Sequence, residues 1–226
     1  MTIVKLRGGN LFLGNMLRRA LASWTIGWAV VAFRFEGQLG HQFISKVVGV
    51  VEDVSMIFTN FKKLTLIGNY GEATYFKAKI NTNGKSILTG GDIILPLGVG
   101  ITNPRQCICH LKNGAPKIFE VLIAKGRGFM SEGRAKNVYN RGQEEYIWTN
   151  VNFNPIKTVT CLNINSNQVS IDGFDCKLVF LNGGINKSSN VISEVCRTLV
   201  SQLSSVKVSL STEFDKNSFT DLSLLL

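Results

Sequence analysis

Two cysteines and a histidine lie within four residues of one another in the segment "CICH", residues 107–110. Thiolate and imidazole groups at such spacing are ligands that zinc prefers, so this segment is the first candidate metal site. A structural zinc site needs four ligands, however, and no second cluster at a matching spacing exists; the one other histidine is His41. In a strand, Cys107 and Cys109 would share one face, where free cysteine behaves as a small hydrophobic residue. We therefore expect a strand here and no metal.

A second candidate is "KGRGF", residues 125–129, where glycines beside cationic side chains would let a phosphate approach the backbone. The segment matches neither G-x-x-x-x-G-K-[ST] nor G-x-G-x-x-G, and a polar segment follows it in place of a clear helix. A tight turn is the favoured interpretation. If the chain were instead a small enzyme that uses this segment, nucleotide binding would depend on Arg127.

The sequence contains no evident pair of catalytic base and nucleophile. It has two histidines, and neither G-x-S-x-G nor H-E-x-x-H occurs in it. A metal-dependent polymerase or nuclease holds Mg²⁺ with clustered carboxylates, yet the sequence has no Asp-x-Asp run. These residue types favour a binding or assembly protein over an enzyme, without a catalytic residue or a cofactor of its own.

One segment, "LGNMLRRALASW" at residues 13–24, has the periodicity of a helix that faces a core. Its apolar stripe consists of Leu17, Ala20, Leu21 and Trp24. Neighbouring residues of a helix point about 100° apart, so Arg18 and Arg19 cannot both grip one small anion. Either these arginines solvate the helix, or a second protein covers that side.

Length and composition limit the classes of protein to which this chain can belong. The chain has 226 residues, enough for one large domain or two small ones. Its five cysteines are odd in number and scattered, which favours a reducing compartment over a disulfide scaffold. The longest apolar run, residues 28–33, is far shorter than the roughly 20 residues that a bilayer requires. We expect neither membrane association nor a secretory signal.

The formal net charge of +10 suggests an acidic partner such as nucleic acid. Lysines and arginines are nevertheless spread along the chain without a dense basic run. The chain is also rich in asparagine, isoleucine and phenylalanine, as an A+T-biased genome such as that of an organelle would encode. Charge alone therefore does not decide the function.

The middle of the chain is β-rich. Residues 29–37 are β-branched and aromatic and end at glycine, which is typical of a strand. Residues 64–159 contain short apolar segments separated by Gly, Asn and Pro, and the polar segment at residues 131–145 is expected to be a loop. The strands predicted in this block lie at residues 73–80, 92–96, 105–111 and 118–124.

Two further helices are predicted. Residues 49–64 form one, with Glu52 and Asp53 in its first turn, where the helix dipole favours acidic groups. Its apolar stripe is Val50, Val54, Ile57, Phe58 and Phe61. Residues 186–206 form the other, with Ile192, Val195, Cys196, Leu199, Leu203 and Val206 on one face. Residues 210–226 have no sustained pattern and are expected to be loosely ordered.

Taken in order, these motifs resemble the amino-terminal domain of the α subunit of bacterial-type, multisubunit RNA polymerases. Residues 13–19 meet the family pattern L-G-N-x-L-R-R. The segment "EGQLGHQF" is similar to the H-E-[FY] segment of the family, with Gln42 in place of the acid. Similar segments follow in the family's order, and together they cover about residues 5–206: "GVVEDVSMIFTNFKKL", "GGDIILP", "CHL", "KGRGF", "NFNPIKTV" and "DCKLVFLNGGINKSSNVISEV".

The resemblance implies an α+β fold. Residues 1–27 and 155–226 would form a helix-containing dimerisation domain from both chain ends, and residues 28–154 a β-rich insert domain. It also implies a non-catalytic subunit that pairs with a second α subunit, with a homodimer as the expected form. The pair would nucleate assembly, one protomer mainly holding the β subunit and the other mainly β′. Catalysis and Mg²⁺ would belong to those large subunits, and DNA would be reached only through the complex.

The resemblance further implies which residues make each contact. In the family the apolar face of the first helix supports the dimer, and its arginine side docks the β subunit. Arg19 is the first choice for that contact, with Arg18 on its flank. The residues carried over to the β-subunit contact are Gly14, Asn15, Arg18, Arg19, His41 and Phe43. Those carried over to dimerisation are Leu17, Leu21, Trp24, Val195, Leu199 and Leu203.

The sequence departs from the family before the last helix. Leu181 stands where the family has threonine in T-N-G, and the Pro-x-Glu-Ala helix start is missing. The chain stops soon after that helix, so the carboxy-terminal domain that contacts promoter DNA and activators is expected to be absent. "DIILP" and "DCKLVFLNGG" are most similar to plastid versions, so we expect a plastid location, with another bacterial-type organelle as the alternative. The alternative function is a free-standing basic protein whose nucleic-acid affinity falls steeply with salt.

Overall fold

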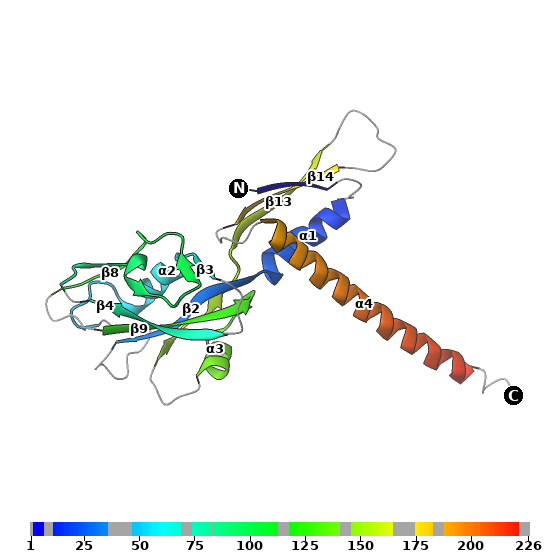
Figure 1. Cartoon of the computed structure of the whole chain (residues 1–226). Coiled ribbons are helices and arrows are strands. Elements are labelled where there is room, and N and C mark those ends of the chain that lie inside the picture. The colour runs from blue at the N-terminus through cyan, green and yellow to red at the C-terminus, as the bar shows by residue number, and fades with distance from the viewer. Residues whose placement is uncertain are drawn as a thin grey trace. The chain divides into compact units, whose positions relative to one another are not determined.

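The computed structural model describes residues 2–6, 11–35, 47–68, 74–82, 84–112, 118–140, 146–164, 175–182 and 188–221. The chain divides into two compact units, Met1–Asn186 (unit 1) and Lys187–Leu226 (unit 2). Unit 1 holds all the described strands, and unit 2 is built on one long helix (Figure 1). Helices combined with a strand-rich centre confirm the predicted α+β fold.

A small antiparallel sheet in unit 1 joins segments that are far apart in the sequence. Strand β14 (Asp175–Asn182) lies between β1 (Thr2–Leu6) and β13 (Ile156–Ile164). Helix α1 (Leu11–Trp24) packs on β13 and β14. The first residues of the chain therefore share a sheet with residues 156–164 and 175–182, and described residues between 26 and 148 form a second, larger sheet.

The larger sheet is antiparallel and is centred on two long strands. β2 (Ile26–Phe35) pairs with β9 (Ile118–Arg127) from end to end, with a register shift between Val30 and Ala32. The order across the sheet is β6 (Ile93–Ile94), β4 (Tyr75–Asn81), β9, β2, β3 (Leu66–Gly68) and β7 (Val99–Ile101), and β11 (Ile147–Trp148) also pairs with β2.

Two two-stranded ribbons accompany the larger sheet: β10 (Phe129–Met130) with β12 (Val151–Asn152), and β5 (Ile87–Thr89) with β8 (Cys107–His110). A 3₁₀ turn, η1, spans Gly90–Asp92. The strands predicted from the sequence are confirmed, with ends that differ by a few residues.

Helices cover both faces of the larger sheet. On one face, helix α2 (Val54–Lys62) places aromatic rings on β2, with the Phe33 centroid 4.5 Å from that of Phe58. Burying one such side chain contributes roughly 1.5–3 kcal/mol. On the other face, helix α3 (Glu132–Tyr139) packs Ala135 and Tyr139 against a separate cluster. Because β2 is buried on both sides, its sequence is an almost continuous apolar run.

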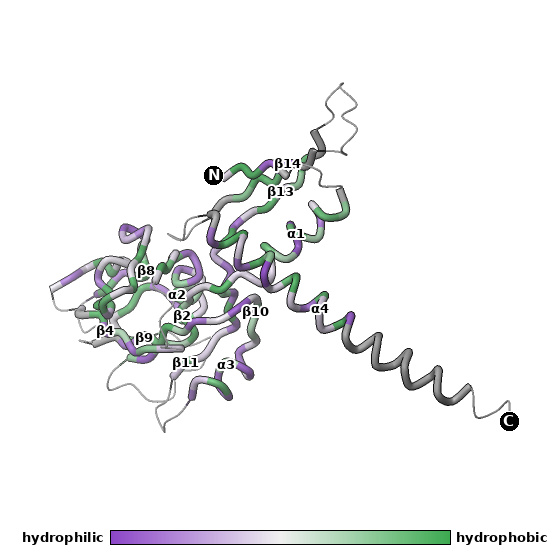
Figure 2. The backbone as a smooth tube through the Cα atoms, turned by 45° about the vertical axis from the view of Figure 1, so that its right-hand side comes forward, coloured by the Kyte–Doolittle hydropathy of each residue, from purple (hydrophilic) through white to green (hydrophobic). Residues whose placement is uncertain are grey.

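Helix α3 corrects the prediction of a polar loop at residues 131–145. Ser131 occupies its N-cap position, and Glu132 lies in its first turn. Only Ala135 and Tyr139, one turn apart, are buried, and the Tyr139 hydroxyl donates to the Lys125 carbonyl at 3.1 Å. The rest of the helix is mainly hydrophilic (Figure 2). Two core-facing residues are too few to give a recognisable period, so the sequence pattern predicted a loop.

Helix α2 begins at Val54, later than the predicted residue 49. Asp53 is its N-cap, and one carboxylate oxygen accepts from the Met56 backbone N–H at 2.8 Å. Glu52 is therefore outside the helix and does not contribute to its first turn. The buried stripe itself is confirmed, since Val50, Val54, Ile57, Phe58 and Phe61 are all buried.

Unit 2 consists of helix α4 (Ser188–Asp221), which runs past the predicted end at residue 206. The expectation of loose order from residue 210 is therefore wrong as far as Asp221, where the helix ends. No glycine or proline interrupts residues 188–221, and these are the residue types that most strongly end a helix. Within the described ranges, no helix has the length and apolar character that crossing a membrane would require.

Candidate functional site

Helix α1 has two distinct faces. Gly14, Leu17, Ala20 and Leu21 are buried on the side that packs on β13 and β14. The opposite face is exposed and carries Phe12, Asn15, Arg19, Ala22 and Ser23. A helix repeats every 3.6 residues, so these five positions form one stripe. We call this stripe the outer face of α1.

The two adjacent arginines have different surroundings. Arg19 lies in the middle of the outer face, and its side chain makes no ion pair or hydrogen bond with any residue that the structure describes. Arg18 is half-buried on the flank, and its Nε donates to Asn15 Oδ1 at 3.4 Å. Arg19 is thus the arginine that an external partner could reach.

The end of α1 is held by segments more than 100 residues away in the sequence. The last carbonyls of a helix have no partner within it, and other groups must satisfy them. Asn154 Nδ2 donates to the carbonyls of Leu21 and Ala22. The turn at Gly128, with φ +64°, lies so near that a Cβ there would be 2.9 Å from the Ser23 carbonyl oxygen. The outer face is therefore presented on a fixed helix.

The same turn settles the structure of "KGRGF". Lys125 to Arg127 belong to β9, Gly128 makes the turn, and Phe129 begins β10, so the predicted tight turn is confirmed. The Lys125 backbone is already bonded, its N–H to the Thr74 carbonyl at 2.8 Å and its carbonyl to Tyr139.

The residues assigned to dimerisation divide by exposure. Leu17 and Leu21 are 5% and 1% exposed, so any contribution that these two leucines make to pairing is through support of the helix, whereas Trp24 is half-buried. In unit 2, Val195 and Leu199 are buried, whereas Leu203 is 57% exposed. The roles of all these residues stay predictions. His41 and Phe43, assigned to the β-subunit contact, lie outside the described residues.

Gly14, also assigned to that contact, is buried on the inner side of α1, away from Asn15 and Arg19. The outer face, on the other hand, includes Phe12, which the sequence analysis did not select. Phe12 precedes the predicted start of the helix at residue 13, and its own exposure gives no periodic signal.

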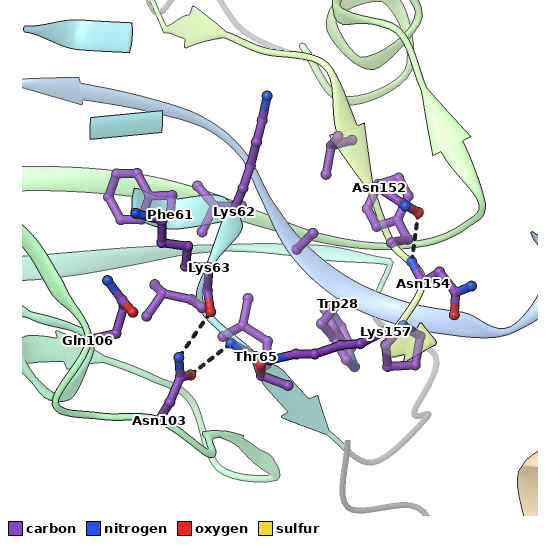
Figure 3. A pocket seen from close by; sticks show the side chains of 17 residues that line it. Trp28, Phe61, Lys62, Lys63, Thr65, Asn103, Gln106, Asn152, Asn154 and Lys157 are labelled. Atoms are coloured by element: carbon purple, nitrogen blue, oxygen red, sulfur yellow. Dashed lines mark hydrogen bonds between the residues drawn. The ribbon is translucent and has the colours of Figure 1, made fainter. Parts of the chain in front are cut away.

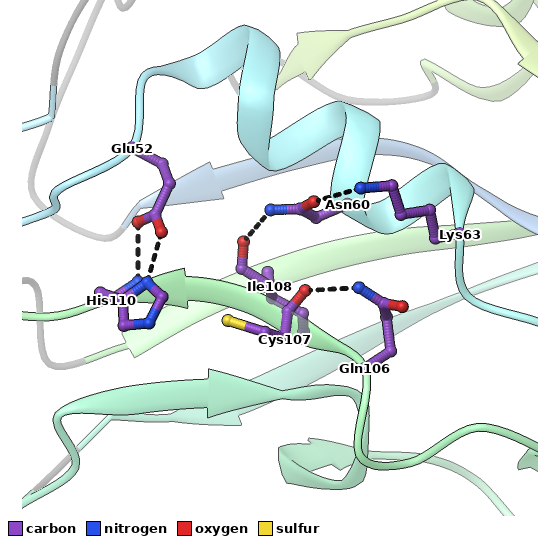
Figure 4. Close-up of polar contacts among 7 residues, drawn as sticks. All are labelled: Glu52, Asn60, Lys63, Gln106, Cys107, Ile108 and His110. Carbon is purple, nitrogen blue, oxygen red and sulfur yellow. Dashed lines mark hydrogen bonds and ion pairs between the residues drawn. The ribbon is translucent and has the colours of Figure 1, made fainter.

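The "CICH" segment forms β8, as predicted. Cys109 is fully buried, and burial raises the pKa of its thiol to about 12, with the negative charges of Glu52 and Cys107 adding to the rise. His110 is directed to Glu52, which binds both its ring Nδ1 and its backbone N–H (Figure 4). Among the described residues no three His, Cys, Asp or Glu side chains gather closely enough to hold a metal ion.

A cavity of about 470 Å³ opens between the end of α2 and the segment at residues 151–157 (Figure 3). Its ionisable lining residues are Lys62, Lys63 and Lys157. Lys62 Nζ is bound to Asn150 Oδ1 at 2.6 Å and Lys63 Nζ to Asn60 Oδ1 at 3.2 Å, so the ammonium groups are directed apart. Burial lowers the pKa of Lys62. The described lining contains no carboxylate.

Among the described residues, Glu120 on β9 is the one acidic residue classed as buried, and its charge is neutralised in place. Its Oε2 lies 2.6 Å from Arg34 Nε and accepts from the Tyr146 hydroxyl at 3.3 Å, and Lys79 Nζ is 3.7 Å from Oε1. A buried charge with several partners is a structural feature, and nothing in the contacts leaves this carboxylate available as a base. The geometry therefore favours a protein-contact site on α1 over a catalytic site.

Comparison with known proteins finds similar sequences among RNA polymerase subunits. The family described as "RNA polymerase Rpb3/RpoA insert domain" matches residues 32–154, more than half of the chain. A DNA-directed RNA polymerase subunit alpha from Carboxydothermus hydrogenoformans is 41% identical over 130 residues, which cover 58% of this chain and 40% of that protein. The corresponding protein of Moorella thermoacetica is 38% identical over 130 residues, with the same shares of 58% and 40%.

A DNA-directed RNA polymerase subunit alpha from Alkaliphilus metalliredigens aligns over more of the chain. It is 33% identical over 223 residues, which cover 93% of this chain and 68% of that protein. The chain thus spans 40% of the length of the first two relatives and 68% of the third.

Proposed function

Since the chain belongs to the alpha-subunit family of bacterial-type RNA polymerases, we propose that it is a non-catalytic alpha subunit of a DNA-directed RNA polymerase. In this proposal two copies pair, and the pair nucleates assembly by holding the β and β′ subunits. Nucleotidyl transfer and its Mg²⁺ belong to the large subunits, and this chain reaches DNA only through the complex.

The observation that carries the proposal is the position of Arg19. Its guanidinium is exposed in the middle of the outer face of α1, with no partner among the described residues. The helix beneath it is fixed at its end by Asn154, so little backbone entropy remains to be lost on docking. An arginine that becomes buried at the centre of an interface is a typical hot spot, because its planar group binds a carboxylate through two parallel hydrogen bonds.

Pairing is supported by the composition of α4. Val200, Leu203 and Val206 are 63%, 57% and 54% exposed, at spacings that place them along one side of the helix. An exposed apolar stripe of this kind favours association, and obligate interfaces usually bury roughly 2,000 Å² or more. A second copy of this chain is the partner that we propose for it.

The plastid location is a further part of the proposal. It rests on the likeness of "DIILP" and "DCKLVFLNGG" to plastid versions and on the abundance of asparagine, isoleucine and phenylalanine. Immunodetection of the chain in fractionated cells of its source tests it: enrichment with plastid markers supports the proposal, and enrichment with another compartment overturns it.

Affinity purification of the tagged chain from its source tests the assembly role. Arg19→Ala is expected to keep the second alpha subunit but lose the β subunit. Arg105→Ala, which removes another exposed arginine from the loop before β8, is the matched control and is expected to retain both. Urea unfolding of each variant checks that its stability stays within about 0.5 kcal/mol of the parent, as is usual for exposed positions.

The outcome separates the candidate functions. Recovery of two very large subunits, identified as β and β′ by mass spectrometry, supports the polymerase proposal. If the parent chain is recovered alone, or with nucleic acid that is released by salt, the proposal fails and the basic nucleic-acid-binding protein replaces it.

A further inference from the structure

Phe12, at the start of α1, is an exposed aromatic residue that the proposed function does not use. Its side chain is 74% exposed, although phenylalanine gains roughly 1.5–3 kcal/mol from full burial. The residues around it on the outer face are polar or small, namely Asn15, Arg19, Ala22 and Ser23. Phe12 is therefore the one large apolar side chain among the five residues of the outer face.

Phe12 and Arg19 are aligned on the helix. They are seven residues apart, which is close to two full turns, so both side chains project from the same face. At 1.5 Å per residue, their Cα atoms are separated by about 10 Å along the axis. Asn15 lies between them, and its Oδ1 is engaged by Arg18. The start of the outer face is thus apolar, whereas its middle is cationic.

We propose that Phe12 is a second anchor of this interface and sets its specificity together with Arg19. This inference rests on the proposed function, because the occupant is a segment of the β subunit. That segment presents an apolar recess to Phe12 and a carboxylate to Arg19, about 10 Å apart along the helix. Aromatic residues and arginine are the residue types that most often dominate the energy of protein interfaces.

The chemistry of the outer face favours a protein over a nucleic acid. The described residues of this face supply a single cation, and a polyanion is usually held by several. Arg19 has no carboxylate partner within the described part of the chain, so its charge is available for one from outside. A folded polypeptide can offer one carboxylate beside an apolar recess, and it can do so at a fixed separation.

The test is reconstitution of the full chain with the β and β′ subunits of the same source, measuring the β subunit recovered per alpha subunit. Phe12→Ser is expected to weaken recovery at least about tenfold, as loss of an interface anchor does. Phe12→Leu, which keeps an apolar side chain, is expected to retain most of the binding. Phe129→Ser is the matched control, because Phe129 is 67% exposed on β10 and is not one of the five residues of the outer face.

Three measurements make the result decisive. Pairing of alpha subunits, measured by sedimentation, and the melting temperature are both expected to be unchanged in Phe12→Ser, since the side chain is exposed. The inference is overturned if Phe12→Ser binds β as the parent does, if Phe129→Ser weakens binding equally, or if Phe12→Ser loses pairing instead. If the parent itself recovers no β subunit, the proposed function fails and the inference fails with it.

Discussion

Glu52 joins the start of α2 to the end of β8 through two contacts with His110. Its Oε2 accepts the His110 backbone N–H at 2.7 Å, and its Oε1 lies 2.5 Å from the ring Nδ1 (Figure 4). Burial opposes ionisation of this carboxyl, but the hydrogen bonds from His110 outweigh it, so the pKa of Glu52 is held below its ordinary value. These residues are 58 positions apart in the sequence.

A pH dependence of stability follows from this pair. A carboxyl whose pKa is lowered in the folded state stabilises the protein fully at pH values above its unfolded-state pKa of about 4.3. This stabilisation is lost as the pH falls through the pKa of the folded state. Glu52→Gln is expected to lower the free energy of unfolding at pH 7 by about 1–2 kcal/mol, a range that allows for the half-exposed His110.

Urea unfolding between pH 7 and pH 3 measures this effect. The difference between parent and Glu52→Gln is expected to shrink at the acid end, where the parent carboxyl becomes protonated. Glu132→Gln, an exposed carboxyl on α3, serves as the control and is expected to follow the parent. If the free energies of unfolding of the parent and of Glu52→Gln differ by the same amount at every pH in this range, Glu52 does not have a lowered pKa in the folded protein.

Two glycines are expected to respond oppositely to alanine. Gly128 has φ +64° and lies against the Ser23 carbonyl, so Gly128→Ala is expected to destabilise the protein by about 1–2 kcal/mol. Gly133 lies within α3 with nothing near the added Cβ, so Gly133→Ala is expected to stabilise by about 0.5–1 kcal/mol. Thermal unfolding of both variants gives the sign directly, and equal shifts would show that neither local conformation is as described.

Pairing of the subunit is expected to depend on the exposed stripe of α4. Leu203→Asp introduces a charge where an apolar contact is proposed, and it should convert the dimer to a monomer in sedimentation experiments. Gln202→Asp introduces the same charge at the neighbouring exposed position and should leave the dimer intact. A dimer that survives Leu203→Asp would remove this stripe from the interface.

Thiol reactivity is expected to separate the cysteines. The thiolate is the reactive species, and Cys109 is fully buried with a pKa of about 12. Iodoacetamide at pH 8 should therefore modify Cys196, which is half-buried, well before Cys109. Peptide mapping by mass spectrometry measures the rates at which Cys196 and Cys109 are alkylated in one sample. Rapid labelling of Cys109 in the folded protein would mean that β8 opens readily.

Local pattern was sufficient for much of the fold. The stripes of α1 and α2 appear in the sequence because each helix buries one side, and β2 appears as an apolar run because both of its faces are covered. Such elements have many core-facing residues at a regular spacing. The same order of local motifs also indicated the family, which the comparisons then showed over residues 32–154.

Elements held by few or distant contacts were not predictable in this way. Helix α3 depends on two buried residues, and Glu52 was placed in a helix because its partner His110 is remote in the sequence. Likewise, no periodic signal marks Phe12, since an exposed residue is recognised only once the buried side of its helix is known.

The sequence by itself thus determined which segments are helices and strands wherever one side is buried at a regular spacing. The preference for Arg19 over Arg18 came from the resemblance to the family and stays a prediction. Only the tertiary structure decided what fixes α1, because Asn154 and Gly128 reach its end through chain folding. It also decided that Arg19 and Phe12 share an exposed face. Periodicity depends on neighbours along the chain, whereas exposure and distant hydrogen bonds depend on neighbours in space.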